Sequence, residues 1–267
     1  MAIINIKIQQ YWDERAKAAQ LNPNATTDDV YLRELEIRTF SEAINRLKKK
    51  SLYILDLGCG DGFTTISVAN KINGCKLLGV DYSDNMIAIA SSRLKKEVDS
   101  KLIKRVEFIT GDAMTIGKQF KKETFDIILS SRCLINLNSS NQQYRTIRQI
   151  SEIMKRNGIY ISIENFEDGH KELNDLRKQM GLSEISVRWH NLYFKPEDYL
   201  NKTRKIFKSV EICNFSSSYY YATRVIYSKY CQMKNISPDY LHEIHKLSID
   251  LPSSGNYSPV KLVIHKK

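Results

Sequence analysis

The chain has 267 residues, a net charge of +11 and five cysteines. We expect a cytoplasmic protein without membrane insertion, because no run approaches the roughly 20 apolar residues of a membrane helix and the N-terminus lacks an apolar signal-peptide stretch. The cysteines are odd in number, widely spaced and without a C-x-x-C pair, so neither a disulfide framework nor a metal site is indicated.

The positive charge is spread over small clusters rather than gathered in one basic tract. Lysines stand at positions 48–50, at 95–96 and within 118–122, mostly where helices are expected to end and where cations complement the helix dipole. We therefore do not expect nucleic acid as a partner, whereas the positive field suits an anionic small molecule. The oligomeric state stays open.

Two helices are predicted before residue 50. The first surrounds Tyr11 and Trp12, and the second is opened by the polar residues 26–29. One face of the second helix is apolar and consists of Phe40, Ala43, Ile44 and Leu47. We expect both helices to cap the ligand site that follows, with Trp12 either facing the ligand or simply packing in the core.

Residues 55–63 read as an apolar strand that runs into three glycines at alternate positions, Gly58, Gly60 and Gly62. Glycine has no Cβ, so the backbone can turn sharply and a ligand can approach closely. The dinucleotide fingerprint G-x-G-x-x-G is absent because Phe63 stands where its third glycine would be, and no Walker-type Gly-Lys-Ser/Thr is present.

A second strand, residues 77–81, ends in a carboxylate 21 positions after Gly60. This spacing fits one strand–helix–strand unit, and a carboxylate at the end of the second strand can accept both hydroxyls of a ribose. We therefore predict Asp81 as the ribose ligand. The alternative is that Asp81 caps the helix that starts near Ser83.

Five further strands are predicted, at residues 106–110, 125–130, 159–163, 210–214 and 260–264. A helix with Tyr144, Ile147, Ile150 and Met154 on one face precedes the fifth strand and is expected to end at Asn157 and Gly158. The predicted fold class is α/β, with a Rossmann-like seven-stranded doubly wound sheet.

These motifs, in this order, resemble the class I S-adenosylmethionine-dependent methyltransferases from about residue 52 to residue 165. The resemblance implies a mostly parallel sheet with an antiparallel last strand, helices on both faces, and S-adenosyl-L-methionine as cofactor. It implies that Asp56 orders the glycine loop near the methionine amino group, that Asp112 accepts from the adenine N6, and that the fourth strand opens over the sulfur at Ser130. The implied cofactor-binding set is Asp56, Gly58, Cys59, Gly60, Asp81, Tyr82, Met86, Asp112, Ala113 and Ser130.

We predict one domain over residues 1–267, with capping helices in 1–50, the cofactor-binding core in 51–165, and lid insertions in 166–205 and 215–257. Both insertions follow strands at the ligand-bearing edge, so acceptor specificity is expected there.

A hydroxyl acceptor needs a general base near the transferred methyl group. His190, in an aromatic and polar segment of the first insertion, is our predicted base, although a lone histidine is more often a structural hydrogen-bonding group. Glu164, at the end of the fifth strand, is the competing catalytic residue.

Arg132, after the fourth strand, is predicted to clamp a phosphate or carboxylate, or else to form a salt bridge with a core carboxylate. Asn136 occupies a place where many relatives carry a histidine, which weakens a base assignment there. The predicted substrate-binding residues are Trp12, Arg132, Asn136, Asn165, Trp189, Tyr193, Tyr220 and Arg224.

Residues 189–194 and 256–261 look like segments of bacterial methyltransferases of surface-polysaccharide biosynthesis. This likeness implies a nucleotide-linked sugar or phosphorylated metabolite as acceptor, with O-methylation slightly favoured over N-methylation. One alternative is an RNA methyltransferase that uses the basic surface, although strand four ends in Leu-Ser-Ser-Arg rather than in the Asn/Asp-Pro-Pro-Tyr/Phe motif of many base N-methyltransferases. Another is a non-catalytic cofactor-binding partner subunit.

Overall fold

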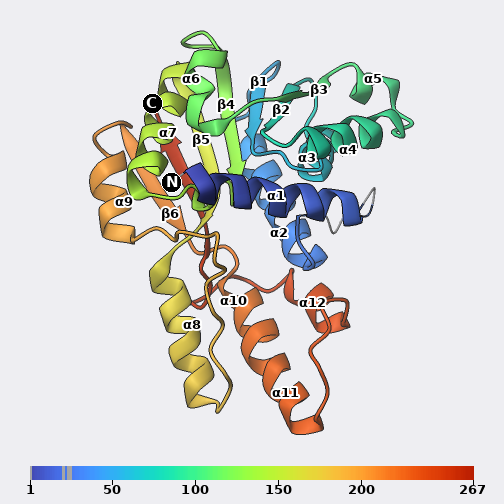
Figure 1. Ribbon diagram of the computed structural model, residues 1–267, viewed down its shortest axis with the longest axis vertical. Helices are drawn as coiled ribbons and strands as arrows, with labels where there is room; N and C mark the ends of the chain where they lie inside the picture. The colour runs from blue at the N-terminus through green and yellow to red at the C-terminus, as the bar shows by residue number, and fades with distance from the viewer. Residues whose placement is uncertain (1, 20–21, 23–25) are drawn as a thin grey trace.

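A seven-stranded sheet with the strand order β3-β2-β1-β4-β5-β7-β6 forms the centre of the structure (Figure 1). The computed structural model describes the backbone of residues 2–19, 22 and 26–267. The strands are β1 (Tyr53–Leu57), β2 (Lys76–Asp81), β3 (Val106–Thr110), β4 (Phe125–Ser131), β5 (Met154–Asn165), β6 (Ser209–Cys213) and β7 (Val260–Lys266).

The central strands pair in parallel, and β7 runs antiparallel to both β5 and β6. Parallel strands covered by helices on both faces carry almost continuous apolar runs, as β1 does with Ile54, Leu55 and Leu57 all buried. The predicted fold, including the antiparallel last strand, is confirmed.

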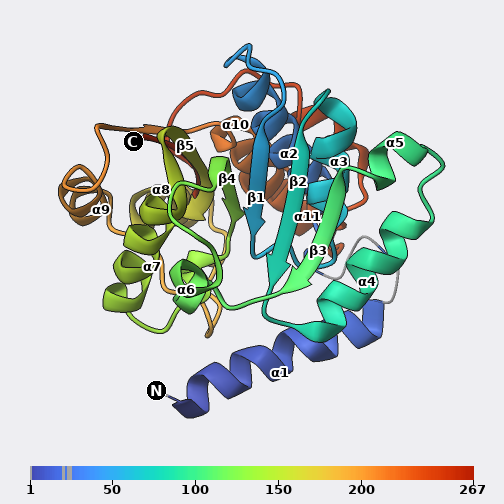
Figure 2. The same ribbon diagram turned by 90° about the horizontal axis from the view of Figure 1, so that it is seen from above.

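Helices cover the two faces of the sheet (Figure 2). One face packs against α2 (Val30–Asn45), α3 (Phe63–Lys71) and α4 (Asp84–Lys95). The other packs against α6 (Ile116–Gln119), α7 (Ser140–Ile153) and α9 (Pro196–Thr203). The short helix α5 (Ser100–Ile103) precedes β3, and α1 (Ala2–Ala19) lies across the carboxyl ends of the strands, next to α4.

Apart from α9, the helices of the two predicted insertions form a separate layer, here called the lid layer, beyond the carboxyl ends of the parallel strands (Figure 1). They are α8 (Glu167–Gln179), α10 (Ser217–Tyr220), the π-helix η3 (Tyr221–Ile226), α11 (Tyr227–Lys234) and α12 (Glu243–Ser248). Helix α9, which ends the first predicted insertion, differs because its Tyr199 is fully buried against Phe166 and Phe194. It therefore belongs to the layer on the sheet.

The prediction that Asn157 and Gly158 end the helix before β5 is wrong. The helix ends at Ile153, and Met154 already has the extended dihedral angles φ −82° and ψ 135°. Gly158 is not among the glycines with positive φ, so it does not take the left-handed conformation of a helix-capping glycine. Both residues lie in β5, where the register against β4 shifts between Phe125 and Ile127.

None of the helices in the described part of the chain is long and apolar enough to cross a membrane.

Candidate functional site

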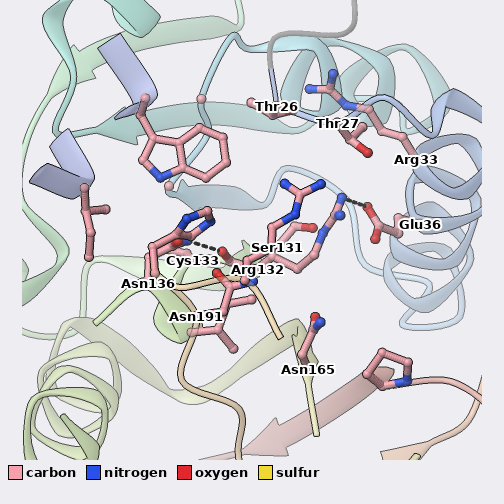
Figure 3. Close-up of a pocket in the computed structure, with 18 of the residues that line it drawn as sticks. Thr26, Thr27, Arg33, Glu36, Ser131, Arg132, Cys133, Asn136, Asn165 and Asn191 are labelled. Atoms are coloured by element: carbon pink, nitrogen blue, oxygen red, sulfur yellow. Dashed lines mark hydrogen bonds and ion pairs between the residues drawn. The ribbon is translucent and has the colours of Figure 1, made fainter. Parts of the chain in front are cut away.

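A cavity of about 560 Å³ opens at the carboxyl ends of the parallel strands. Its walls come from the loops after β1, β2, β3, β4 and β5, from α1 and α2, and from several residues within the segments 185–193 and 220–224 of the two insertions. The position agrees with the rule that open α/β sheets bind ligands where the strand order reverses, which here is at β1. Figure 3 shows polar side chains converging on this cavity from several elements.

The glycine loop forms one end of the cavity. Gly58 and Gly60 have φ values of +77° and +53°, which L-residues rarely adopt. A Cβ on Gly58 would lie 2.6 Å from Sγ and 2.7 Å from Cβ of Cys133, and one on Gly60 would lie 2.8 Å from Thr26. The loop therefore needs glycine both for its turn and for the closeness of its neighbours.

Asp81 is buried at the end of β2 and lines the cavity. Its carboxylate accepts hydrogen bonds from the backbone N–H of Gly60 (2.9 Å) and of Ser83 (3.0 Å). Ser83, rather than Asp81, caps α4 by accepting from Met86 N. Burial raises the pKa of Asp81 to about 6, although both backbone bonds oppose the shift.

Asp56 is also buried on the cavity wall, where it accepts a 2.5 Å hydrogen bond from the Thr65 hydroxyl. Burial raises its pKa to about 6 as well. Asp112 accepts from Met114 N and thereby holds the turn after β3 in place. The other predicted cofactor residues that line the cavity are Gly58, Cys59, Gly60, Tyr82, Met86 and Ala113.

These residues fit S-adenosylmethionine. The glycine loop provides a cradle that a Cβ would fill, and the hydroxyl of Tyr82 is buried without a hydrogen-bond partner among the described residues. Two carboxylates, Asp56 and Asp81, face the same space, which suits a ligand with a cationic amino group and ribose hydroxyls.

Helix α1 closes the cavity next to the cofactor residues, as the sequence predicted. Trp12 lines the cavity and also packs beside Ala16 and Met86, so both readings of this residue apply. The helix is fastened by a 2.5 Å hydrogen bond from the Ser83 hydroxyl to Asp13.

Three predicted site residues do not line the cavity, namely Ser130, Glu164 and Trp189. Ser130 is fully buried and hydrogen-bonds to Tyr160 (2.8 Å) and Glu164 (3.3 Å). Glu164 is fully buried too, and its carboxylate accepts from the backbone N–H groups of Leu134 (3.0 Å) and Ile135 (3.3 Å). Through these two bonds Glu164 holds the first residues of the short helix η2 (Leu134–Asn136) in place.

The assignments of Ser130 to the cofactor and of Glu164 to catalysis are therefore wrong. Side chains alternate along a strand, so Ser131 faces the cavity where Ser130 does not. Burial raises the pKa of Glu164 to about 7, but its side chain is fully buried and does not line the cavity.

His190 also lines the cavity and is 6% exposed. Its ring lies 4.7 Å from that of Tyr11 and 5.7 Å from that of Trp12. Burial, and secondarily the charge of Arg188, lower its pKa to about 4. The imidazole is therefore neutral at pH 7, and its Nδ1 has no hydrogen-bond partner among the described residues.

The predicted substrate contact of Trp189 is wrong. Its side chain is 61% exposed and is not part of the cavity wall. It packs edge-on against Tyr11 and His190, and so covers the outside of the site. Adjacent residues in this turn point in opposite directions, which the sequence does not reveal.

Arg132 forms the salt bridge that was the alternative to an anion clamp. Its guanidinium donates to Glu36 of α2 at 2.9 Å, and both side chains line the cavity (Figure 3). Arg224 is paired in the same way with Asp29, the N-cap residue of α2. The remaining predicted acceptor residues, Asn136, Asn165, Tyr193 and Tyr220, all line the cavity.

The charged residues of this wall that the sequence analysis missed include Glu36 and Arg188. Glu36 shares one helix face with Asp29, Leu32 and Arg33, the i, i+3, i+4, i+7 pattern of a buried stripe. Charged residues at the spacing of a buried helix face were a signal in the sequence that these side chains could belong to the site. Arg188 is exposed, lines the cavity and forms no ion pair among the described residues.

Comparisons with known proteins agree with this site. Residues 48–214 match a family model described as a methyltransferase domain. The demethylmenaquinone methyltransferase of Lactococcus lactis is 34% identical over 115 residues, which are 42% of this chain and 42% of that protein. The malonyl-[acyl-carrier protein] O-methyltransferase of Bacillus cereus is 23% identical over 212 residues, 78% of this chain and 68% of that protein.

The match to the first of these relatives thus spans less than half of that protein's length. Among solved structures, a SAM-dependent methyltransferase from Archaeoglobus fulgidus superposes with a TM-score of 0.57 and 17% identity, and covers 88% of this chain and 94% of that one. This likeness shows a shared fold.

Proposed function

The chain belongs to the class I S-adenosylmethionine-dependent methyltransferases, and from this premise we propose that it methylates a small polar acceptor that carries an anionic group. The observation that carries the proposal is one continuous cavity that runs from the glycine loop to Arg188 beneath the lid layer. Its volume of about 560 Å³ lies in the range typical of small-molecule sites.

S-adenosylmethionine, when bound, supplies a methyl group on a sulfonium, which is a good leaving group. In our proposal Asp56 faces its amino group, Asp81 its ribose hydroxyls and Asp112 its adenine. Tyr82 and Met86 flank the adenosine. These assignments rest on the cavity-lining positions of the five side chains and on the resemblance described above.

The chain then contributes mainly by holding the acceptor in line with the methyl group, an effect worth up to roughly 7–11 kcal/mol. Trp12 and Tyr11 from α1 and His190 from the lid layer pack together over the site. This aromatic cover excludes water from the reacting atoms, which strengthens every electrostatic contact inside.

The anionic group of the acceptor is assigned to Arg188. Arg132 and Arg224 are already neutralised by Glu36 and Asp29, whereas Arg188 has no ion pair in the described part of the chain. Tyr193 and Asn165 lie on the same wall and offer polar contacts for hydroxyl groups.

His190 is proposed to contact the acceptor as a neutral imidazole; its low pKa, about 4, disfavours the predicted role as general base. O-methylation stays slightly favoured over N-methylation in this proposal. The finer assignment to a nucleotide-linked sugar of surface-polysaccharide biosynthesis also stays a proposal, because the relatives described above act on other acceptors.

The test is the formation of S-adenosylhomocysteine by the purified protein. Separate reactions contain nucleotide sugars with phosphorylated metabolites, the same metabolites after phosphatase treatment, and total RNA. We expect turnover with the phosphorylated pool and its loss after phosphatase treatment. Turnover with RNA alone would support the RNA alternative, and inactivity until a second protein is added would support the partner-subunit alternative.

A further inference from the structure

Glu36 presents one unpartnered carboxylate oxygen on the wall of the cavity. Its side chain is 2% exposed, and Oε2 accepts from Arg132 while Oε1 has no hydrogen-bond partner among the described residues. Leaving a buried polar atom unpaired costs about 1–3 kcal/mol. Because both side chains line the cavity, a donor group of the bound ligand explains the free oxygen.

Arg132 fixes the direction of this carboxylate. Its backbone has φ +49°, a left-handed conformation that costs a non-glycine residue about 1–2 kcal/mol. Two hydrogen bonds hold it there, from Arg132 N to Ile163 O (2.7 Å) and from Asn136 Nδ2 to Arg132 O (2.7 Å). Figure 3 shows the resulting guanidinium reaching across to Glu36. Strain of this kind is typical of functional sites.

The other unpartnered groups on this wall cannot replace Glu36. Asn136 Oδ1 and Asn165 Oδ1 also lack partners within the described part of the chain, but an amide oxygen accepts a hydrogen bond without taking up a proton. Glu164 lies outside the cavity, and the lowered pKa of His190, about 4, makes it a weak base.

We propose that Glu36 is the catalytic residue that receives the proton of the methyl acceptor, and that Arg132 is its positioning residue. This inference rests on the proposed function. Oε1 accepts a hydrogen bond from the acceptor's O–H or N–H. As the acceptor's oxygen or nitrogen forms its bond to the methyl carbon, the proton passes to Oε1 and the electron pair of the broken carbon–sulfur bond stays on sulfur. The proton then leaves Glu36 for water.

The electrostatic surroundings agree with this role. Asp29 and Arg33 on α2 and Arg132 after β4 are the charged groups that act on Glu36. Burial is the largest influence and raises the pKa of Glu36 above its usual 4.5, although Arg132 and Arg33 lower it. A raised pKa makes the carboxylate a stronger base than an exposed glutamate.

The experiment compares Glu36→Gln with the control Glu34→Gln, which changes an exposed glutamate of the same helix. We would measure S-adenosylhomocysteine formation with the phosphorylated metabolite pool from about pH 5 to pH 9, and S-adenosylhomocysteine affinity by calorimetry. We expect Glu36→Gln to lower kcat by about 100-fold or more and to lose the rise of rate with pH. Its cofactor affinity should stay near that of the wild type, and Glu36→Asp should recover part of the rate.

A Glu36→Gln variant with wild-type kcat and pH profile would overturn this inference and leave the proposed function standing.

If the wild type turns over no small-molecule pool, the proposed function fails instead. The role of Glu36 is then tested by measuring the binding of glycerol 3-phosphate and of phosphoethanolamine. Binding is followed by the fluorescence of Trp12, in proteins that carry Trp189→Phe and have S-adenosylhomocysteine bound. Binding that weakens about tenfold in Glu36→Gln supports the inference, and equal or absent binding in both proteins overturns it.

Discussion

The carboxylate of Asp81 accepts a 2.9 Å hydrogen bond from the backbone N–H of Gly60, although 21 positions separate them in the chain. The parallel pairing of β1 and β2 places Leu57 beside Val80, so the glycine loop and the acidic end of β2 emerge side by side. The sheet therefore builds the two halves of the cofactor site as one unit, and disturbing either half should disturb the other.

Gly58→Ala should weaken S-adenosylhomocysteine binding by about tenfold or more. The new Cβ would lie 2.6 Å from Sγ and 2.7 Å from Cβ of Cys133, so the loop must move. Gly74→Ala is the matched control, because Gly74 has a similar φ of +71° but no atom of the described residues lies within 4 Å of its added Cβ. Calorimetry should show weakened binding only in the first variant; equal affinities would show that the loop does not contact the cofactor.

Asp81→Asn should lower the affinity for S-adenosylhomocysteine and remove part of its pH dependence. The pKa of Asp81 is raised to about 6, so below that pH the group is protonated and must lose its proton before it can accept both ribose hydroxyls. In the wild type, affinity should rise with pH through about 6 and then level off. Asp56, with a similar pKa, contributes to the same rise, so the variant should flatten it only in part. Full affinity in Asp81→Asn at neutral pH would refute the ribose assignment.

The strands and the glycine loop were predictable from sequence because their signals are local. Apolar runs of strand length, glycines at alternate positions and a carboxylate at a fixed distance require no knowledge of distant residues. Ser130 and Ser131 show where prediction from local signals ends. The strand was located correctly, but which of its two adjacent serines faces the cavity depends on how the strand is oriented relative to the helices that cover it.

The acceptor end of the cavity was harder to predict because it is made by contacts across the chain. Glu36 and Arg132 are 96 positions apart, and their pairing depends on how α2 packs over the end of β4. Trp189 and His190 are adjacent, yet one is exposed and the other buried, because Tyr11 and Trp12 of α1 both pack against His190 whereas only Tyr11 contacts Trp189. Neither relationship leaves a periodic trace in the sequence.

Arg224→Ala should loosen the lid layer. The Arg224 side chain is 13% exposed and pairs with the buried Asp29, whose carboxylate also accepts from Tyr219. Removing one partner of a buried ion pair typically costs about 3–5 kcal/mol because the other charge is left uncompensated. Hydrogen exchange should accelerate over residues 217–234.

The control for this experiment is Arg46→Ala, which removes an exposed pair with Glu42 at 3.9 Å. Such surface pairs contribute about 0.5 kcal/mol or less. Unchanged exchange in both variants would mean that the Arg224–Asp29 contact does not hold the lid.

His265 should make the protein less stable in acid. It is fully buried and lies between the Tyr199 hydroxyl (2.8 Å) and the Tyr160 carbonyl (3.0 Å). Burial lowers its pKa to about 3, below the value near 6.5 in the unfolded chain. The stabilisation of this neutral form is therefore complete above pH 6.5 and is lost as the pH falls toward 3.

Between pH 6.5 and pH 5 this single group should account for a loss of about 2 kcal/mol in the free energy of unfolding. His265→Asn should show a correspondingly smaller loss in urea unfolding, whereas His242→Asn, at an exposed histidine, should keep the wild-type slope. Identical slopes in all three proteins would exclude His265 as a source of acid sensitivity.

The most direct test of the account follows the methyl group itself. Purified protein and S-adenosylmethionine with a labelled methyl group are incubated with a bacterial extract, and the products are separated into small molecules, RNA and protein. The account predicts label in the small-molecule fraction, retained on an anion exchanger, and no transfer by Asp81→Ala. Label confined to RNA or protein would contradict a small anionic acceptor held in the cavity between the glycine loop and Arg188.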